Sequence, residues 1–276
     1  LWFGGIKITM SSSKYLEKIP ICYMNKKTGK KLIISPADVI KIVIKANRYL
    51  HALNDLFREL NFTIYKTLGQ RNISGFIGEV FVRVFSVEIN GFVTNPHADG
   101  RPDLLDISSK EAFEHFRLKC FSQSDDGVPA PNRSYLAPFK YGGIEVKATI
   151  GNPVSNYRIR LRRKLGKHAF SVGLPRINYL SSITYWGHHR SCENLVGLYY
   201  DYCEELGGVP QIMAVMHAEL VPAEDWSRVS IGKAGSKKTS NTSLSLSGRR
   251  KIMRNPVVVR NHPVYLHKLR QIGLKI

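Results

Sequence analysis

The sequence predicts a mixed α/β fold, and three observations carry that prediction. Ser35, followed by proline and by an aspartate three positions on, is typical of the start of a helix. Residues 144–149 alternate apolar and polar side chains with a period of two, as in a strand with one buried face. The apolar runs 194–202 and 209–220 indicate two buried strands, with a Gly-Gly turn ahead of the second.

The bulk composition is that of a globular protein with one core. The chain has 276 residues, of which 43% are hydrophobic, so we expect a single domain over 1–276. No apolar run reaches the ~18 residues that a membrane span needs, so no membrane association is predicted. The four cysteines lack the paired spacing of a disulfide scaffold, and reduced thiols in a cytoplasm are the simplest interpretation.

Two helices are predicted after an irregular N-terminal segment. Residues 1–33 are expected to be irregular, with a turn at 25–30. The helix that starts after Ser35 carries apolar residues to about Leu60, in a band wide enough to pack on more than one side. Protein core is the first explanation of that band, and a contact between two copies of the chain is the second. A shorter helix is predicted at 75–84, with Ser74 as its N-cap.

Strands, turns and polar segments are predicted after that helix. Residues 85–93 are strand-like, and the turn formers of 94–102 lead to a short strand at 103–107. A polar insertion with three prolines follows at 109–140. A basic C-terminal region covers 227–276, and within it 233–254 has the composition of a loop that becomes ordered only on binding DNA.

The strand at 144–149 carries the clearest chemical signal. A period of two places Ile144, Val146 and Ala148 on one face and Glu145, Lys147 and Thr149 on the other. A carboxylate and an ammonium group then stand about 7 Å apart along one strand. Asp103, which follows a proline, can supply a second carboxylate. Two convergent carboxylates suit Mg²⁺, and a nearby lysine can hold a water against a phosphodiester.

In Pro102-Asp103 and Glu145-Val146-Lys147 the chain resembles the PD-(D/E)XK nucleases, and among them the type II restriction endonucleases. The resemblance implies a central mixed sheet of five or six strands flanked by helices. It also implies that Asp103 and Glu145 hold Mg²⁺, that Lys147 orients the attacking water, and that cleavage leaves a 5′-phosphate. The alternative is that Glu145 and Lys147 form an ordinary exposed pair on a strand.

Three further acids have to be weighed against this set. Restriction-type members often carry a helical glutamate upstream of the aspartate, and Glu79 matches that pattern as an assisting catalytic acid. An outward-facing position for Glu79 is the alternative. Asp99 and Asp106 compete with Asp103, which is preferred because proline precedes it and apolar residues follow. Glu145 comes 42 positions after Asp103, a long interval for the family.

The net charge of +20 is concentrated in two stretches without acids, 146–192 and 227–276. Such blocks suit the neutralisation of DNA phosphates, although a solubilising surface or an anionic membrane surface would use them too. The expected DNA-binding residues are Arg158, Arg160, Arg162, Arg163, Lys164, His188, His189, Arg190, Lys237, Lys238, Arg249 and Arg250. The two histidines could instead hydrogen bond within the fold.

The sequence as a whole predicts a Mg²⁺-dependent endonuclease of restriction type that cuts double-stranded DNA. A homodimer is expected, because a two-fold protein matches a palindromic site. A repair or junction-resolving nuclease on the same fold is one alternative. A basic nucleic-acid-binding protein without chemistry is the other.

Overall fold

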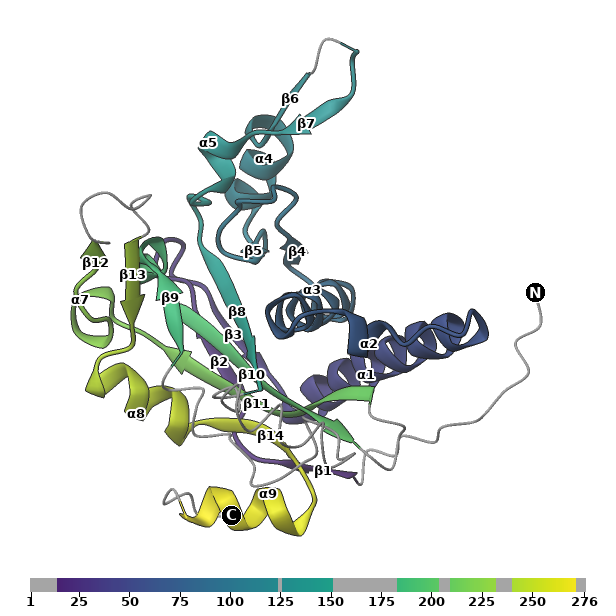
Figure 1. Cartoon of the computed structure of the whole chain (residues 1–276). Coiled ribbons are helices and arrows are strands. Elements are labelled where there is room, and N and C mark those ends of the chain that lie inside the picture. The colour runs from purple at the N-terminus through teal and green to yellow at the C-terminus, as the bar shows by residue number, and fades with distance from the viewer. Residues whose placement is uncertain (1–13, 124–125, 151–182, 204–208, 232–239, 272–276) are drawn as a thin grey trace.

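The computed structural model describes residues 14–123, 126–150, 183–203, 209–231 and 240–271. Their centre is a seven-stranded mixed sheet (Figure 1). Across the sheet the strands are β1 (Tyr15–Glu17), β14 (Pro256–Arg260), β11 (Val209–Glu219), β10 (Asn194–Cys203), β8 (Gly143–Thr149), β5 (Leu104–Asp106) and β4 (Phe92–Thr94). The mixed α/β class is therefore confirmed, with one strand more than the largest sheet expected.

Strand β8, which lies next to the central strand β10, pairs in parallel on one side and antiparallel on the other. It runs parallel to β10 on one side and antiparallel to β5 on the other. Among the strands that the structure describes, all the remaining neighbouring pairs in this sheet are antiparallel. The predicted strands at 144–149, 194–202 and 209–220 are thus the three adjacent central strands β8, β10 and β11.

Strand alternation divides the apolar residues between two cores. The even-numbered Val196, Leu198 and Tyr200 of β10 lie in the larger core, whereas Leu195 and Tyr199 lie in the smaller one. Helices α1 (Pro36–Glu59) and α3 (Gln70–Glu88) contribute to the larger core, and α8 (Leu246–Arg254) and α9 (Pro263–Gln271) contribute to the smaller one. Both faces of the sheet are covered by helices, which explains the continuous apolar runs of β10 and β11 (Figure 1).

Helix α1 begins as its sequence predicts. The Ser35 side chain accepts a hydrogen bond from the backbone nitrogen of Asp38 at 3.1 Å, and proline occupies the first turn. Its buried residues, which include Val39, Ile42 and Leu50, pack in the larger core. Core packing therefore accounts for much of the wide apolar band of this helix, while Leu56 and Leu60 near its end are exposed.

Helix α3 is longer than predicted at both ends. It begins after Gly69, so Ser74 is not its N-cap but lies within the helix, where its hydroxyl is 2.9 Å from that of Tyr200. It continues to Glu88, so the predicted strand at 85–93 is wrong over 85–88, and only its last two residues form a strand, in β4. Helical spacing explains this: Phe81 and Phe85 are four residues apart and both fully buried. The short helix α2 (Ile64–Thr67) precedes α3.

The N-terminal segment is more regular than predicted. Besides β1, it forms a hairpin of β2 (Ile21–Met24) and β3 (Lys31–Ile34). The predicted turn between them is confirmed: Asn25 Oδ1 accepts hydrogen bonds from the backbone nitrogens of Lys27 and Thr28.

The predicted insertion at 109–140 is a folded arm that projects from the sheet (Figure 1). Its elements are α4 (Lys110–Lys119), β6 (Phe121–Gln123), β7 (Pro129–Pro131) and α5 (Arg133–Leu136). A small core of its own, made of Leu105, Cys120, Leu136 and Phe139, ties the arm to β5.

The C-terminal region is also structured where it is described. A second sheet contains β12 (Ser230–Ile231), β13 (Ser240–Ser243) and β9 (Thr184–Trp186), beside the helices η3 (Gly187–Ser191) and α7 (Pro222–Asp225). The predicted loop at 233–254 is wrong for 240–254, which contains β13 and α8. None of the described helices is both long and apolar enough to cross a membrane.

Candidate active site

The pairing of β5 with β8 brings the two predicted metal-binding carboxylates together. Leu104 lies opposite Ile144 in this antiparallel pair. Extending the register by one residue places Asp103 opposite Glu145, and side chains opposite each other in this way have Cβ atoms about 5 Å apart. Asp103 Oδ2 also accepts a hydrogen bond of 2.8 Å from the backbone nitrogen of Val146. Strand pairing thus bridges the long interval between the two acids.

The electrostatics around Asp103 are those of a crowded anionic site. Burial and the negative charge of Glu145 hold the pKa of the Asp103 carboxyl well above its usual range. The charge of Glu79 adds to this effect, while the Val146 amide and the Lys147 ammonium oppose it. A carboxyl perturbed in this way is stabilised in its charged form by an added cation.

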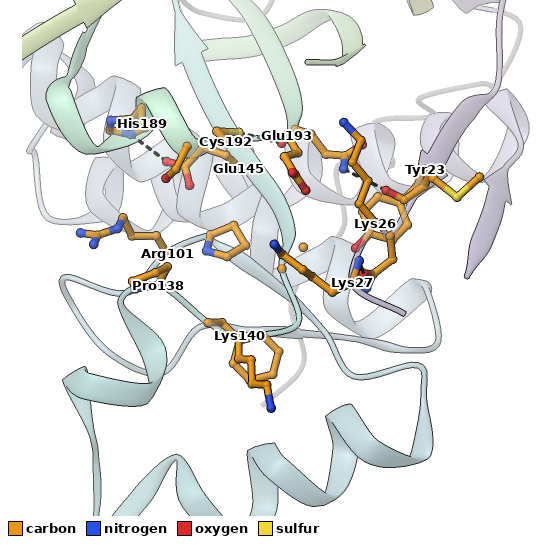
Figure 2. Close-up of a pocket in the computed structure, with 18 of the residues that line it drawn as sticks. Tyr23, Lys26, Lys27, Arg101, Pro138, Lys140, Glu145, His189, Cys192 and Glu193 are labelled. Atoms are coloured by element: carbon orange, nitrogen blue, oxygen red, sulfur yellow. Dashed lines mark hydrogen bonds and ion pairs between the residues drawn. The ribbon is translucent and has the colours of Figure 1, made fainter. Parts of the chain in front are cut away.

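Glu145 is held by a histidine that follows much later in the chain. Only 9% of Glu145 is exposed, and its Oε1 lies 2.8 Å from Nε2 of His189. Nδ1 of His189 lies 3.1 Å from the carbonyl oxygen of Trp186. Both neighbours are acceptors, so both ring nitrogens donate when the imidazole carries two protons. Figure 2 shows His189 pointing at Glu145. This contact fixes one oxygen of Glu145 and leaves the other for a ligand.

Lys147 is positioned on the same face of β8 as Glu145. The side chain is half-buried, and its Nζ lies 5.8 Å from the centroid of the Tyr185 ring. At that distance a cation is attracted to the face of an aromatic ring. The ring of Tyr185 is itself buried, packing edge-on to Trp226 at 5.0 Å between centroids. The ammonium group of Lys147 therefore lies over the ring of Tyr185, which is held in place by its packing against Trp226.

The thiol of Cys192 lies close to Glu145. Cys192 donates from Sγ to the carbonyl oxygen of Asn194 at 3.1 Å. Burial and the charge of Glu145 raise the pKa of the Cys192 thiol well above its usual value. The neutral thiol is a poor nucleophile, so the arrangement does not favour covalent catalysis by cysteine.

The competing aspartates have other partners. Asp106 is 1% exposed and accepts hydrogen bonds from Asn25 Nδ2 at 2.5 Å and from the backbone nitrogen of Ser108 at 2.9 Å. Asp99 is exposed and lies 3.8 Å from Arg133. Asp106 therefore stabilises the turn after β5, and Asp99 lies on the surface of the loop between β4 and β5, beside the arm.

The structure brings Glu79 near the site without placing it inside. Its side chain is exposed on α3, a helix that packs on the Ile144 and Val146 face of β8. Glu79 influences Asp103 through its charge, as the weakest of the contributions to that pKa. The role of an assisting acid at longer range stays a prediction.

The predicted DNA-binding residues divide into three groups. Arg158, Arg160, Arg162, Arg163, Lys164, Lys237 and Lys238 lie outside the described residues. His188 and Arg190 in η3 are exposed, as are Arg249 and Arg250 on α8. His189 is buried against Glu145, which is the alternative that its sequence position left open: a hydrogen bond within the fold.

A cavity of about 310 Å³ opens beside Glu145 and His189 (Figure 2). Its wall comes from 23–27 around the β2–β3 turn, from Arg101 and Pro102, from 138–145 and from 188–194. The sequence carried no signal for this cavity, because these four segments are distant in the chain and meet only through the fold.

Asp103 and Glu145 are the two carboxylates of this site that could hold a cation. Within the described residues, no group of three or more histidine, cysteine, aspartate or glutamate side chains could hold a metal ion. Mg²⁺ keeps several waters and is commonly bound through one or two carboxylates, so two are enough.

No protein-family model matches the chain, and no curated protein or solved structure matches it either.

Proposed function

We propose that the chain is a Mg²⁺-dependent endonuclease of the PD-(D/E)XK type that cuts double-stranded DNA. The observation that carries the proposal is the cross-strand placement of Asp103 opposite Glu145, with Lys147 two residues along the same strand. Asp103 and Glu145 would bind the ion, which supplies Lewis-acid stabilisation of the charge that develops on the phosphate. Restriction-type cleavage by a homodimer, leaving a 5′-phosphate, is the finer proposal that the resemblance implies.

The protein side chains have distinct tasks in this proposal. Lys147, braced over Tyr185, donates to the attacking water or to a phosphate oxygen. His189 keeps one oxygen of Glu145 occupied, so the carboxylate presents the other in a fixed direction. The Val146 amide does the same for Asp103. Fixed groups of this kind reduce the reorganisation that the reaction needs.

The alternative of a basic binding protein without chemistry requires Glu145 and Lys147 to be an ordinary surface pair. Glu145 is 9% exposed and paired with a buried histidine, which argues against that role. A junction-resolving nuclease would use the same catalytic residues and differs only in its substrate.

The deciding experiment is cleavage of a supercoiled plasmid with Mg²⁺ or with EDTA, beside a four-way junction. Discrete plasmid fragments that require Mg²⁺ support the restriction-type proposal. Cutting confined to the junction favours the resolving enzyme, and no cutting of either substrate contradicts a nuclease. Lys147→Ala should reduce cleavage by several orders of magnitude because the group that positions water is lost. Lys41→Ala, which removes an exposed lysine on α1, is the matched control and should cut normally.

Metal binding can be measured without any cleavage. A ligand that binds only the folded state raises its stability, so Mg²⁺ should raise the thermal midpoint of the wild-type protein. Asp103→Asn should lose this shift, while Asp99→Asn should keep it. An equal shift in all three proteins would place the ion elsewhere.

A further inference from the structure

Two hollows of the surface meet beside Glu145. One is the cavity of about 310 Å³ described above, which Glu145 and His189 line. The other is a more open hollow, lined by residues of η3 and of α7. The two hollows adjoin, because both are lined by Arg101, His188 and Ser191. Together they form one groove, the Glu145 groove, which passes a candidate metal-binding carboxylate.

The Glu145 groove carries cations on both sides of Glu145. Figure 2 shows Arg101 on one side of Glu145, and Lys26 and Lys27 on the other. Arg101 also lines the more open hollow together with Arg190, and no acid is among the described residues that line this hollow. Positive charge at both ends of a groove attracts an extended anion whose charges lie on either side of the centre.

The side chains of Lys27 and Arg190 are available to bind an anion. Both are exposed, and within the described part of the chain neither forms an ion pair with an acid. Two other cations of the groove are partly engaged. Lys26 Nζ lies 3.9 Å from a carboxylate oxygen of Glu219, and Arg101 Nη2 donates to a backbone carbonyl oxygen at 2.9 Å. Lys27 and Arg190 are therefore the cations with the most charge left for a ligand.

The turn that carries Lys27 is fixed to the strand that leads from Asp103. Asn25, which is 3% exposed, accepts a hydrogen bond from the backbone nitrogen of Lys27 at 2.9 Å. Nδ2 of Asn25 donates to Asp106 Oδ2 at 2.5 Å and to the Tyr141 carbonyl oxygen at 2.9 Å. Asp106 ends β5, which begins directly after Asp103. Buried hydrogen bonds thus set the place of Lys27 relative to the site, and a group held in advance loses less entropy on binding.

We propose that the Glu145 groove holds the sugar-phosphate backbone of the cleaved DNA strand, with Lys27 on a phosphate to one side of the cut and Arg190 on a phosphate to the other. The proposal rests on the proposed nuclease function, because that function brings a scissile phosphate to Glu145. It adds a contact outside the two acid-free stretches, since Lys27 lies in neither. Phosphate contacts fix the register of a protein on DNA, so the two cations position the strand across the metal site.

The test is the salt dependence of binding, measured by the anisotropy of a fluorescein-labelled DNA duplex in EDTA. Each phosphate contact releases condensed counter-ions, so loss of one contact lowers the slope of log K against log salt by about one. Lys27→Gln and Arg190→Gln should each lower the slope by this amount and weaken binding about tenfold at low salt. The double variant should lower the slope by about two. An unchanged slope in either single variant overturns the proposal.

Conservative variants separate the loss of charge from a change in structure. Lys27→Arg and Arg190→Lys keep the charge and should keep the slope of the wild-type protein. Lys31→Gln removes an exposed lysine of the same hairpin that lines neither hollow, and it should also bind as the wild type does. A loss in Lys31→Gln equal to that in Lys27→Gln would assign the effect to overall charge and overturn the proposal.

Uncharged phosphates locate the two contacts relative to the cut. Within a sequence that the wild-type protein cleaves, single phosphates are replaced one at a time by methylphosphonates. A replacement that weakens binding of the wild type but not of Lys27→Gln identifies the phosphate that Lys27 contacts, and Arg190→Gln identifies the other in the same way. The two phosphates should lie on opposite sides of the scissile one. Two phosphates on the same side contradict the proposed path of the strand.

Failure of this inference and failure of the nuclease proposal give different results. A protein that cuts plasmid with Mg²⁺, while both single variants keep the wild-type slope, removes only the proposed use of the groove. A protein whose slopes fall as expected but which never cuts removes the nuclease and leaves a groove that binds a DNA backbone. Lys27→Gln should keep the rise in thermal midpoint that Mg²⁺ produces. Loss of that rise would assign Lys27 to the metal site and overturn its role at a flanking phosphate.

Discussion

The two ends of β5 carry the same type of side chain in opposite surroundings. Asp106 has hydrogen-bond donors on both oxygens, from Asn25 and from Ser108, within a buried turn. Asp103 has one donor, the Val146 amide, and faces a second carboxylate. A carboxylate whose two oxygens both accept hydrogen bonds stabilises the fold. A carboxylate that has only one such donor and faces a second negative charge can bind a cation instead.

The largest expected effect is a difference in cleavage activity between variants of Asp103 and Asp106. Asp103→Asn keeps the size and the hydrogen bond to Val146 but removes metal-binding charge, so cleavage should fall by several orders of magnitude. Asp106→Asn should retain most of the activity, because Asp106 points away from the site. Single-turnover plasmid cleavage at saturating protein measures both. If Asp106→Asn abolishes cleavage and Asp103→Asn does not, the catalytic assignment is displaced by three residues.

The same two variants should have the reverse order in stability. Asp106→Asn replaces an acceptor of several hydrogen bonds with a group that must turn one amide hydrogen toward a donor. Unfolding in urea should show a loss of about 1–3 kcal/mol, the usual penalty for an unsatisfied buried polar group. Asp99→Asn, the same change at an exposed aspartate, is the matched control. An Asp106→Asn protein as stable as wild type would contradict the structural role.

A smaller effect concerns pH. The folded-state pKa of Asp103 lies above the unfolded one, so ionisation of this carboxyl opposes folding. The opposition is absent below the unfolded pKa, about 4, and grows as the pH rises toward the raised pKa of the folded state. Without metal, Asp103→Asn should therefore be more stable than wild type at neutral pH, with a gap that narrows in acid. Urea midpoints in EDTA across this range test the sign, and a constant gap would refute it.

The smallest effect is expected at Asp99, on the surface beside the arm. Asp99 is exposed and its contact with Arg133 is 3.8 Å long, so Asp99→Asn should change stability by less than about 1 kcal/mol. Cleavage should also be unchanged. A large loss of activity in this variant would make Asp99 the metal-binding residue in place of Asp103.

Local patterns predicted the centre of the molecule well. The alternation at 144–149 and the apolar runs of β10 and β11 follow from strand geometry, and the Ser35 cap follows from the needs of a helix end. The strands β1 and β4 have three residues each, too few for a period to be visible. The valines of β14 did offer a signal, and it was missed.

The candidate site was predictable in its residues and not in its contacts. A local motif indicated Asp103, Glu145 and Lys147, but their convergence depends on the register of β5 against β8. The His189–Glu145 pair joins residues 44 positions apart and has no local pattern at all. Tertiary packing decides such pairs, and a single sequence does not display it.

Strand β8 has one consequence for how the protein responds to heat. Its odd-numbered residues Glu145 and Lys147 belong to the candidate site, and its even-numbered Ile144, Val146 and Ala148 belong to the larger core. The reactive groups are thus carried by the same backbone that the core holds in place. Inactivation by heating should coincide with melting of the whole domain, with no temperature interval in which an intact protein has lost its site.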